Sequence, residues 1–217
     1  MGTLVTIQIV GRRNSSDDSR YHAEAIERAF SWFRQVEAAC TRFDPNSELM
    51  QLCGRVGRPV PVSPILYQSV QFALAMAAES GGAFDPTVGH AMELRGFNRE
   101  YRTRQIINTP IHPPPGITYR DVQIDPVDRT ITLLRPLVLD LGAVAKGLAV
   151  DLAARELQPF VNFAINAGGD LYLGGHNANN EPWSVGIRHP RIDGELIDFI
   201  RVSNRAVCTS GDYERRA

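Results

Sequence analysis

The stretch Leu139-Asp140-Leu141-Gly142-Ala143-Val144-Ala145-Lys146-Gly147 does most to decide the fold expected for this chain. An apolar run typical of a strand ends at Gly142, and a helix is expected to follow at once, over residues 143–157. This arrangement can hold a phosphate with free backbone N–H groups and the helix dipole, and Lys146 adds a positive charge. The glycines match neither G-x-x-x-x-G-K-[ST] nor G-x-G-x-x-G. The alternative is an ordinary helix N-terminus that carries a surface lysine.

Hydrophobic periodicity on both sides of this stretch predicts a mixture of strands and helices. Apolar residues at helical spacing predict a helix over residues 20–39. Ser63 and Pro64 are typical of the start of a second helix, which is expected to end before Gly81. Strands are expected at 4–10, 122–124, 130–134, 137–141, 163–165, 171–173, 183–187, 197–202 and 206–209. The pattern predicts one α+β (mixed α/β) domain over residues 1–217, with a largely antiparallel sheet flanked by helices.

Composition limits the classes of partner. The 217 residues are 43% hydrophobic and 22% charged, with a formal net charge of -1, so the chain has no basic field for nucleic acid or an anionic membrane surface. Nowhere do about 18 apolar residues run together, so no transmembrane segment is expected. The N-terminus lacks the features of a signal peptide. A cytoplasmic location is expected for the chain as written, and a membrane-anchored periplasmic one had a signal preceded it.

A second segment with chemical potential is Ser80-Gly81-Gly82-Ala83-Phe84-Asp85-Pro86-Thr87-Val88-Gly89. Ala83, Phe84 and Asp85 place a small residue, an aromatic ring and a carboxylate side by side. Together they could receive a planar heteroaromatic ring, which would pack on Phe84 and donate a hydrogen bond to Asp85. The alternative is a helix C-cap followed by an Asp-Pro turn.

The remaining segments and residues carry weaker signals. Asn166-Ala167-Gly168-Gly169-Asp170 allows close approach of the backbone to a ligand, or simply a hairpin turn. Ser210 lacks a G-x-S-x-G elbow, which argues against a hydrolytic triad. The five histidines lack metal-ligand spacing and are interpreted as surface or loop residues. The three cysteines are odd in number and scattered, so buried reduced thiols are expected.

Seven segments, in order, resemble signatures of the FAD:protein FMN transferase (ApbE) family. They lie at residues 1–3, 41–49, 80–89, 139–147, 166–170, 183–187 and 209–215, and thus cover essentially the whole chain. The resemblance implies an enzyme that binds FAD in a cleft of a mixed α/β fold. It also implies Mg²⁺-dependent transfer of FMN to a Ser or Thr of an acceptor flavoprotein, with release of AMP.

The resemblance also assigns roles to individual positions. FAD contacts are implied for Met1, through its backbone, and for Ala83, Phe84, Asp85, Asp140 and Lys146. The Ala143 carbonyl corresponds to a backbone ligand of the metal. Phe43 stands where the family commonly has a tyrosine, so stacking on the cofactor is expected without a phenolic hydrogen bond. No catalytic residue is assigned.

The end of the chain departs from the family pattern. Relatives continue into a His-x-x-Asp-Pro stretch and a helix whose Asp and Thr complete the metal site. The expectation is therefore a C-terminally truncated member that holds Mg²⁺ poorly, because Mg²⁺ needs near-octahedral oxygen coordination, and that transfers FMN slowly or not at all. The alternatives are a relative that binds FAD without turnover and a non-functional fragment. The missing segment either leaves apolar surface exposed, which would favour self-association into a homo-oligomer, or its loss is absorbed by repacking.

Overall fold

The computed structural model describes residues 2–11, 16–100, 103–192 and 194–209, without the side chains of residues 16–18. The chain divides into two compact units. Unit 1 consists mainly of Arg34–Leu148, and unit 2 of Thr3–Phe33 with Ala149–Arg216. The boundaries fall inside two long helices, α1 (Ser16–Cys40) and α5 (Gly142–Leu157). The prediction of one domain over 1–217 stays a prediction, and the two units are described separately below.

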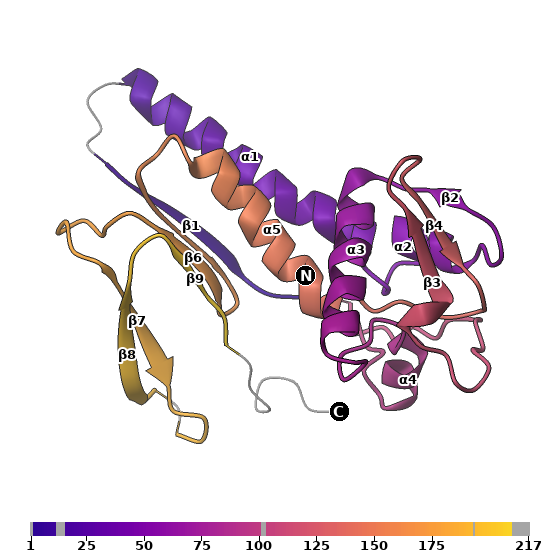
Figure 1. Cartoon of the computed structure of the whole chain (residues 1–217). Coiled ribbons are helices and arrows are strands. Elements are labelled where there is room, and N and C mark those ends of the chain that lie inside the picture. The colour runs from indigo at the N-terminus through magenta and orange to yellow at the C-terminus, as the bar shows by residue number, and fades with distance from the viewer. Residues whose placement is uncertain (1, 12–15, 101–102, 193, 210–217) are drawn as a thin grey trace. The chain divides into compact units, whose positions relative to one another are not determined.

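Unit 1 combines helices with a small antiparallel sheet (Figure 1). The three strands follow the order β2-β4-β3, and Ile131 in β4 pairs with both Val60 and Ile124. The bounds are α2 (Glu48–Cys53), β2 (Val60–Pro61), α3 (Pro64–Glu79), α4 (Gly89–Leu94), the 3-10 helix η1 (Tyr119–Asp121), β3 (Val122–Asp125) and β4 (Thr130–Leu133).

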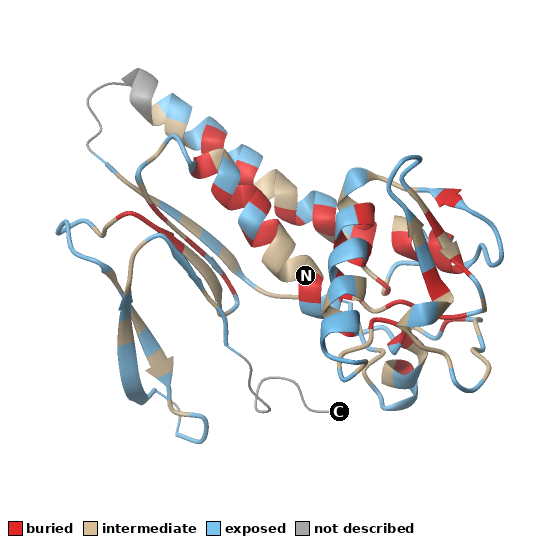
Figure 2. Ribbon diagram, viewed as in Figure 1, coloured by how far each residue is buried: buried red, intermediate tan, exposed pale blue. Residues whose placement is uncertain are grey.

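Side-chain caps determine where the helices of unit 1 begin. Ser47 caps α2 by accepting a hydrogen bond from the Met50 N–H, and Ser63 caps α3 by accepting one from the Leu66 N–H. Pro64 occupies the first position of α3, where no N–H is needed. The apolar faces of these helices meet β4 in a core that Figure 2 shows in red; its fully buried members include Leu49, Leu52, Leu66, Val70, Ile131, Leu133, Leu137 and Leu139.

Unit 2 is built on a four-stranded antiparallel sheet of order β1-β5-β6-β9. Glu156 of α5 accepts hydrogen bonds from Arg28 and Trp32 of α1, which ties the two helical segments of this unit together. Phe163, Ile165 and Leu173 of the sheet are buried. The bounds are β1 (Val5–Val10), β5 (Asn162–Ala167), β6 (Asp170–Gly174) and β9 (Arg205–Val207).

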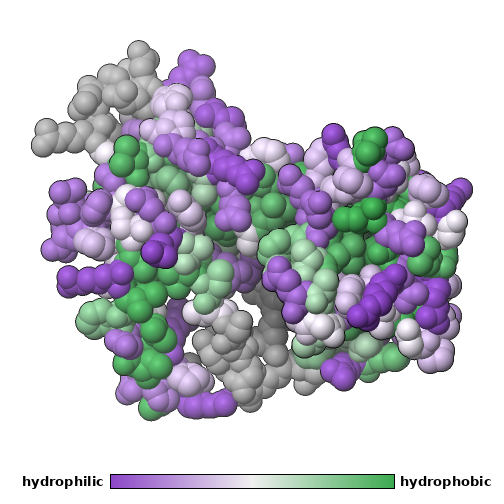
Figure 3. All heavy atoms as spheres, viewed as in Figure 1, coloured by the Kyte–Doolittle hydropathy of each residue, from purple (hydrophilic) through white to green (hydrophobic). Residues whose placement is uncertain are grey.

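A separate antiparallel pair, β7 (Trp183–Arg188) and β8 (Leu196–Val202), completes unit 2. The indole N–H of Trp183 donates to the Gly174 carbonyl and so connects this pair to β6. Large apolar side chains of β8 remain exposed, and Figure 3 shows apolar surface over this pair. They are Leu196, Ile197 and Phe199.

The predicted fold class is confirmed: the chain is a mixed α/β protein with antiparallel sheets and helices. One predicted strand, at 137–141, is wrong. Leu137, Val138, Leu139 and Leu141 are buried, but the ladder is reduced to a single parallel bridge between Val138 and Val88. This apolar run is therefore extended core backbone without a regular strand partner. Within the described residues, no helix is both long and apolar enough to cross a bilayer.

Candidate functional site

Asp140 connects three segments of unit 1. Its Oδ2 accepts a hydrogen bond from Nε of Arg42 at 2.7 Å, and its Oδ1 accepts one from the Gly142 N–H at 2.8 Å. Its own N–H donates to the Pro86 carbonyl at 2.8 Å. The three motifs at 41–49, 80–89 and 139–147 are thus joined at one residue. Each carboxylate oxygen keeps a lone pair for a further donor.

Arg42, which binds Oδ2 of Asp140, also packs against Phe43. The Arg42 side chain is only 4% exposed. Its guanidinium carbon is 4.3 Å from the centre of the Phe43 ring, so the charge covers one ring face. Its Nη2 donates to the Phe97 carbonyl. Phe43 itself is partly exposed, which leaves aromatic surface for a ligand.

The carboxylate of Asp85 is engaged within the chain. Its Oδ1 accepts from the Thr87 N–H and hydroxyl at 2.9 and 2.7 Å, and its Oδ2 accepts from the Tyr119 N–H at 2.9 Å. These bonds form an Asx turn and fix the start of η1, which agrees with the Asp-Pro turn given above as the alternative for this segment. Ala83 is exposed and Phe84 partly exposed beside it. Any ligand bond to Asp85 must therefore be added to three existing ones.

The first turn of α5 offers less bare backbone than its sequence suggests. The Gly142 N–H is capped by Asp140, and the N–H groups of Val144 and Ala145 both donate to the Leu141 carbonyl. These three N–H groups are therefore already hydrogen-bonded within the chain and are not free to bind a phosphate. The dipole remains, Lys146 lies partly exposed in this turn, and Ala143 is exposed at its start.

Glu93 is a buried acid that periodicity does not single out as part of the site. Its side chain is 5% exposed, and its Oε1 lies 4.0 Å from Nη1 of Arg42. Its Oε2 accepts from the Thr109 hydroxyl at 3.0 Å and lies 3.8 Å from Nδ1 of His90. His90 in turn meets His112 edge to face, with ring centres 6.0 Å apart. The sequence did not predict Glu93 as part of the site, because the sequence does not show that Glu93 and Arg42 are buried together.

The glycine-rich segment at 166–170 belongs to unit 2 and forms the turn between β5 and β6. Asn166 accepts from the Gly169 N–H at 3.1 Å, and Gly168 has a φ of +59°. A Cβ at Gly168 would lie 1.8 Å from Oγ1 of Thr3. The close approach seen here is thus to the chain itself, as expected of a hairpin. Met1 and Ser210 lie outside the described residues.

The described residues do not by themselves fit a divalent metal ion. They include no group of three or more His, Cys, Asp or Glu side chains placed to hold one. Ala143 contributes at most one carbonyl oxygen, whereas Mg²⁺ requires near-octahedral oxygen coordination.

The fold and these contacts define the class of protein. It is a mixed α/β protein in which unit 1 carries partly exposed aromatic, acidic and basic side chains, Phe43, Asp140 and Lys146, at or near the start of α5. The sequence is similar to FAD:protein FMN transferases from Vibrio cholerae (28% identity over 222 residues) and Haemophilus influenzae (26% over 230 residues). Each match covers 98% of this chain and 64% of the relative, so the chain spans less than two thirds of their length.

Solved structures of the same kind resemble the whole chain. The ApbE protein of Thermotoga maritima matches with a TM-score of 0.77 at 29% identity, over 98% of this chain and 71% of that one. The flavin transferase ApbE of Vibrio cholerae matches with a TM-score of 0.78 at 27% identity, over 100% and 71%. The model of the ApbE family matches residues 1–217. The chain belongs to the ApbE family.

Proposed function

We propose that this chain is a flavin transferase that moves FMN from FAD to a Ser or Thr of an acceptor flavoprotein and releases AMP. Family membership over residues 1–217 supports the proposal. The observation that carries it is the Asp140 junction, because it joins the three segments whose residues the resemblance assigns to FAD. The named relatives are FAD:protein FMN transferases.

Each described residue of the proposed site has a role suited to its surroundings. Phe43 presents a partly exposed ring for stacking, and Phe84 with Ala83 adds apolar surface. Asp140 accepts a hydrogen bond from the flavin nucleotide with a lone pair that Arg42 and Gly142 do not use. Lys146 adds positive charge for the pyrophosphate at the start of α5. Met1 completes the proposed set from outside the described residues.

In the proposed reaction the acceptor hydroxyl oxygen bonds to the phosphorus on the FMN side of the pyrophosphate. The bond from that phosphorus to the bridging oxygen breaks, AMP leaves with that oxygen, and the hydroxyl proton passes to solvent. Positive charge near the leaving phosphate favours this displacement. No described residue is assigned as the base.

Mg²⁺ dependence is part of the proposal because the resemblance implies it, and Ala143 is the residue proposed to contribute to the metal site. A divalent ion would neutralise charge on the pyrophosphate. The described residues do not fit the ion by themselves.

The test is incubation with FAD, Mg²⁺ and an acceptor fragment of the quinone-reductase type, followed by intact-mass spectrometry. Transfer adds to the acceptor the mass of FMN less one water, and omission of Mg²⁺ with added EDTA should abolish the increase. A Ser/Thr→Ala acceptor is the matched control. FAD binding without any mass increase would refute transfer and support the alternative, a relative that binds FAD without turnover.

A further inference from the structure

The guanidinium of Arg42 is buried between two carboxylates. Nε donates to Oδ2 of Asp140 at 2.7 Å, and Nη1 lies 4.0 Å from Oε1 of Glu93. Nη2 is held by the Phe97 carbonyl. The Arg42 and Glu93 side chains are 4% and 5% exposed. Three nitrogens of a planar group thus face three acceptors on two segments, which leaves the guanidinium little rotational freedom.

The same guanidinium contacts the two groups that the proposed function gives to the flavin nucleotide on this side of the site. It covers one face of the Phe43 ring, with its central carbon 4.3 Å from the ring centre. It also holds Asp140, whose other oxygen caps α5. The carboxylate and the ring therefore share one rigid support. Both remain partly exposed, whereas Arg42 does not.

Most buried polar atoms in folded proteins have a hydrogen-bond partner. In the described part of the chain, Nη1 of Arg42 and Oε1 of Glu93 are buried without a hydrogen-bond partner, although they are only 4.0 Å apart. An unsatisfied buried group of this kind is destabilising, because it has lost its hydrogen bonds to water. The orientation of the guanidinium thus follows Asp140, Phe97 and Phe43 at the expense of Glu93.

We propose that Arg42 is a positioning residue for FAD: it does not touch the nucleotide but sets the positions of the Asp140 carboxylate and the Phe43 ring. The inference rests on the proposed function. Lysine could not replace Arg42 in this role, because an ammonium group is a point charge that lacks the planar fork and the stacking face.

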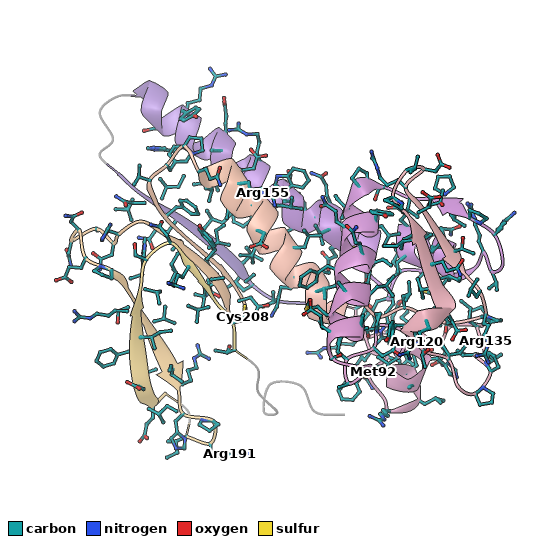
Figure 4. All side chains as sticks on the ribbon, in the orientation of Figure 1. Met92, Arg120, Arg135, Arg155, Arg191 and Cys208 are labelled. Carbon is teal, nitrogen blue, oxygen red and sulfur yellow. The ribbon has the colours of Figure 1, made fainter. Side chains whose placement is uncertain are left out.

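The experiment compares Arg42→Lys with Arg135→Lys in the whole chain. Arg135 is the control in unit 1 (Figure 4): it also pairs with a carboxylate, Asp121 at 3.7 Å, and donates to backbone carbonyls, those of Pro115 and Gly116, but its side chain is 37% exposed. FAD affinity is measured by calorimetry well below the midpoint of thermal unfolding. We expect Kd for FAD to rise at least tenfold in Arg42→Lys and to stay within twofold in Arg135→Lys.

A double variant separates positioning from a general loss of structure. Since Arg42 acts through Asp140, adding Arg42→Lys to Asp140→Asn should raise Kd by much less than tenfold over Asp140→Asn alone. Where transfer is observed, KM for FAD should rise tenfold with kcat within threefold. Independent effects of the two substitutions would contradict the assignment.

The remaining outcomes are also decisive. If the unsubstituted chain does not bind FAD, the proposed function and this inference fail together. If it binds FAD and Arg42→Lys binds equally well, this inference fails alone. Arg42→Gln, which keeps a planar donor for Asp140, serves if the lysine variant does not fold. Should neither variant give the near-ultraviolet circular dichroism of the unsubstituted chain, Arg42 is structural and the positioning role is refuted.

Discussion

Both carboxylate oxygens of Asp140 accept hydrogen bonds within unit 1. One caps the first N–H of α5, and the other accepts a charge-assisted hydrogen bond from a guanidinium 98 positions earlier in the chain. Removing one partner of a buried pair costs more than the pair contributes, because the remaining charge stays buried. Glu93 partly compensates for such a loss, since it already lies 4.0 Å from Arg42.

We therefore expect Asp140→Asn to lower the free energy of unfolding by about 2 kcal/mol. Asparagine can still cap Gly142, so most of the loss comes from the charge opposite Arg42. Urea unfolding followed by circular dichroism measures the change. Asp125→Asn is the control: Asp125 caps an exposed turn at Val127 and should change the stability by less than about 0.5 kcal/mol. Equal effects of the two substitutions would contradict this account of Asp140.

The cysteines divide into two classes by burial. Desolvation raises the pKa of the Cys40 and Cys53 thiols from 9.0 to about 11. Cys208, at the end of β9, is exposed (Figure 4). All three lie in the described part of the chain, and none is in a disulfide. The expectation of buried reduced thiols is thus confirmed for Cys40 and Cys53 and wrong for Cys208.

At pH 8 a thiol reagent should modify only Cys208 in the native chain and all three cysteines in urea, and Cys208→Ser should abolish the native signal.

The buried thiols also predict how stability depends on pH. Between pH 9 and 11 the unfolded chain loses thiol protons that the folded chain keeps, so the free energy of unfolding falls as pH rises through this window. The loss is on the order of 2 kcal/mol per thiol. Unfolding curves at pH 8 and 10.5 measure it, and a flat profile would contradict the burial argument.

At the scale of elements, close backbone packing joins α4 to the extended run before α5. Val88 and Val138 form a parallel bridge, and the Gly89 N–H donates to the Val138 carbonyl at 3.0 Å. A Cβ built on Gly89 would lie 2.6 Å from the Val138 carbonyl oxygen and 2.7 Å from Cγ1. The carbonyl belongs to buried backbone, which cannot move away cheaply.

Gly89→Ala should therefore destabilise the chain by about 2 kcal/mol or more. Gly147→Ala is the matched control. A Cβ there meets nothing within 4 Å, and alanine is favoured over glycine inside a helix by up to about 1 kcal/mol. The two Gly→Ala changes should thus have opposite signs in thermal unfolding. A stabilising Gly89→Ala would show that the contact with Val138 relaxes.

Local signals in the sequence predicted the elements whose ends depend on their own residues. Ser63 and Pro64 predict the start of α3 because capping is a property of neighbouring residues. The short helices α2 and α4 were missed because one and a half turns give too little periodicity. The apolar composition of 137–141 predicts a strand, which is wrong because such composition indicates burial and cannot reveal whether a ladder partner exists.

The candidate site was predictable only in part for the same reason. The resemblance named Asp140 and Phe43, but it could not indicate that Arg42 lies against both, since nothing in the sequence relates position 42 to position 140. Nor could it show that the Asp85 carboxylate already accepts three hydrogen bonds. The roles of Met1, Ala83, Phe84, Asp85, Asp140 and Lys146 toward FAD stay predictions.

At the scale of the whole molecule, ligand binding and stability are linked. If FAD binds only the folded chain, it stabilises that chain by RT ln(1 + [L]/Kd), about 2.7 kcal/mol at a hundredfold excess over Kd. We expect the unfolding temperature to rise with the logarithm of FAD concentration above Kd. Riboflavin, which lacks the pyrophosphate, is the control and should give a smaller rise. An unfolding temperature that does not depend on FAD would contradict the proposed function.

The exposed apolar residues of β8 belong to the same scale. Leu196, Ile197 and Phe199 are each more than half exposed. A homo-oligomer stays a prediction, which sedimentation velocity over a hundredfold range of concentration would test.

The pairing of β1 with β5 has a consequence for biosynthesis. Val5 pairs with Ala167, so β1 waits for more than 150 further residues before its partner leaves the ribosome. At the usual 5–20 residues per second this delay is roughly 8–30 s. Most of unit 1, Arg34–Leu148, is synthesised entirely within that interval. The residues of nascent unit 1 are thus complete while β1 still lacks its partner β5, and β1 stays open to contacts with other chains during that interval.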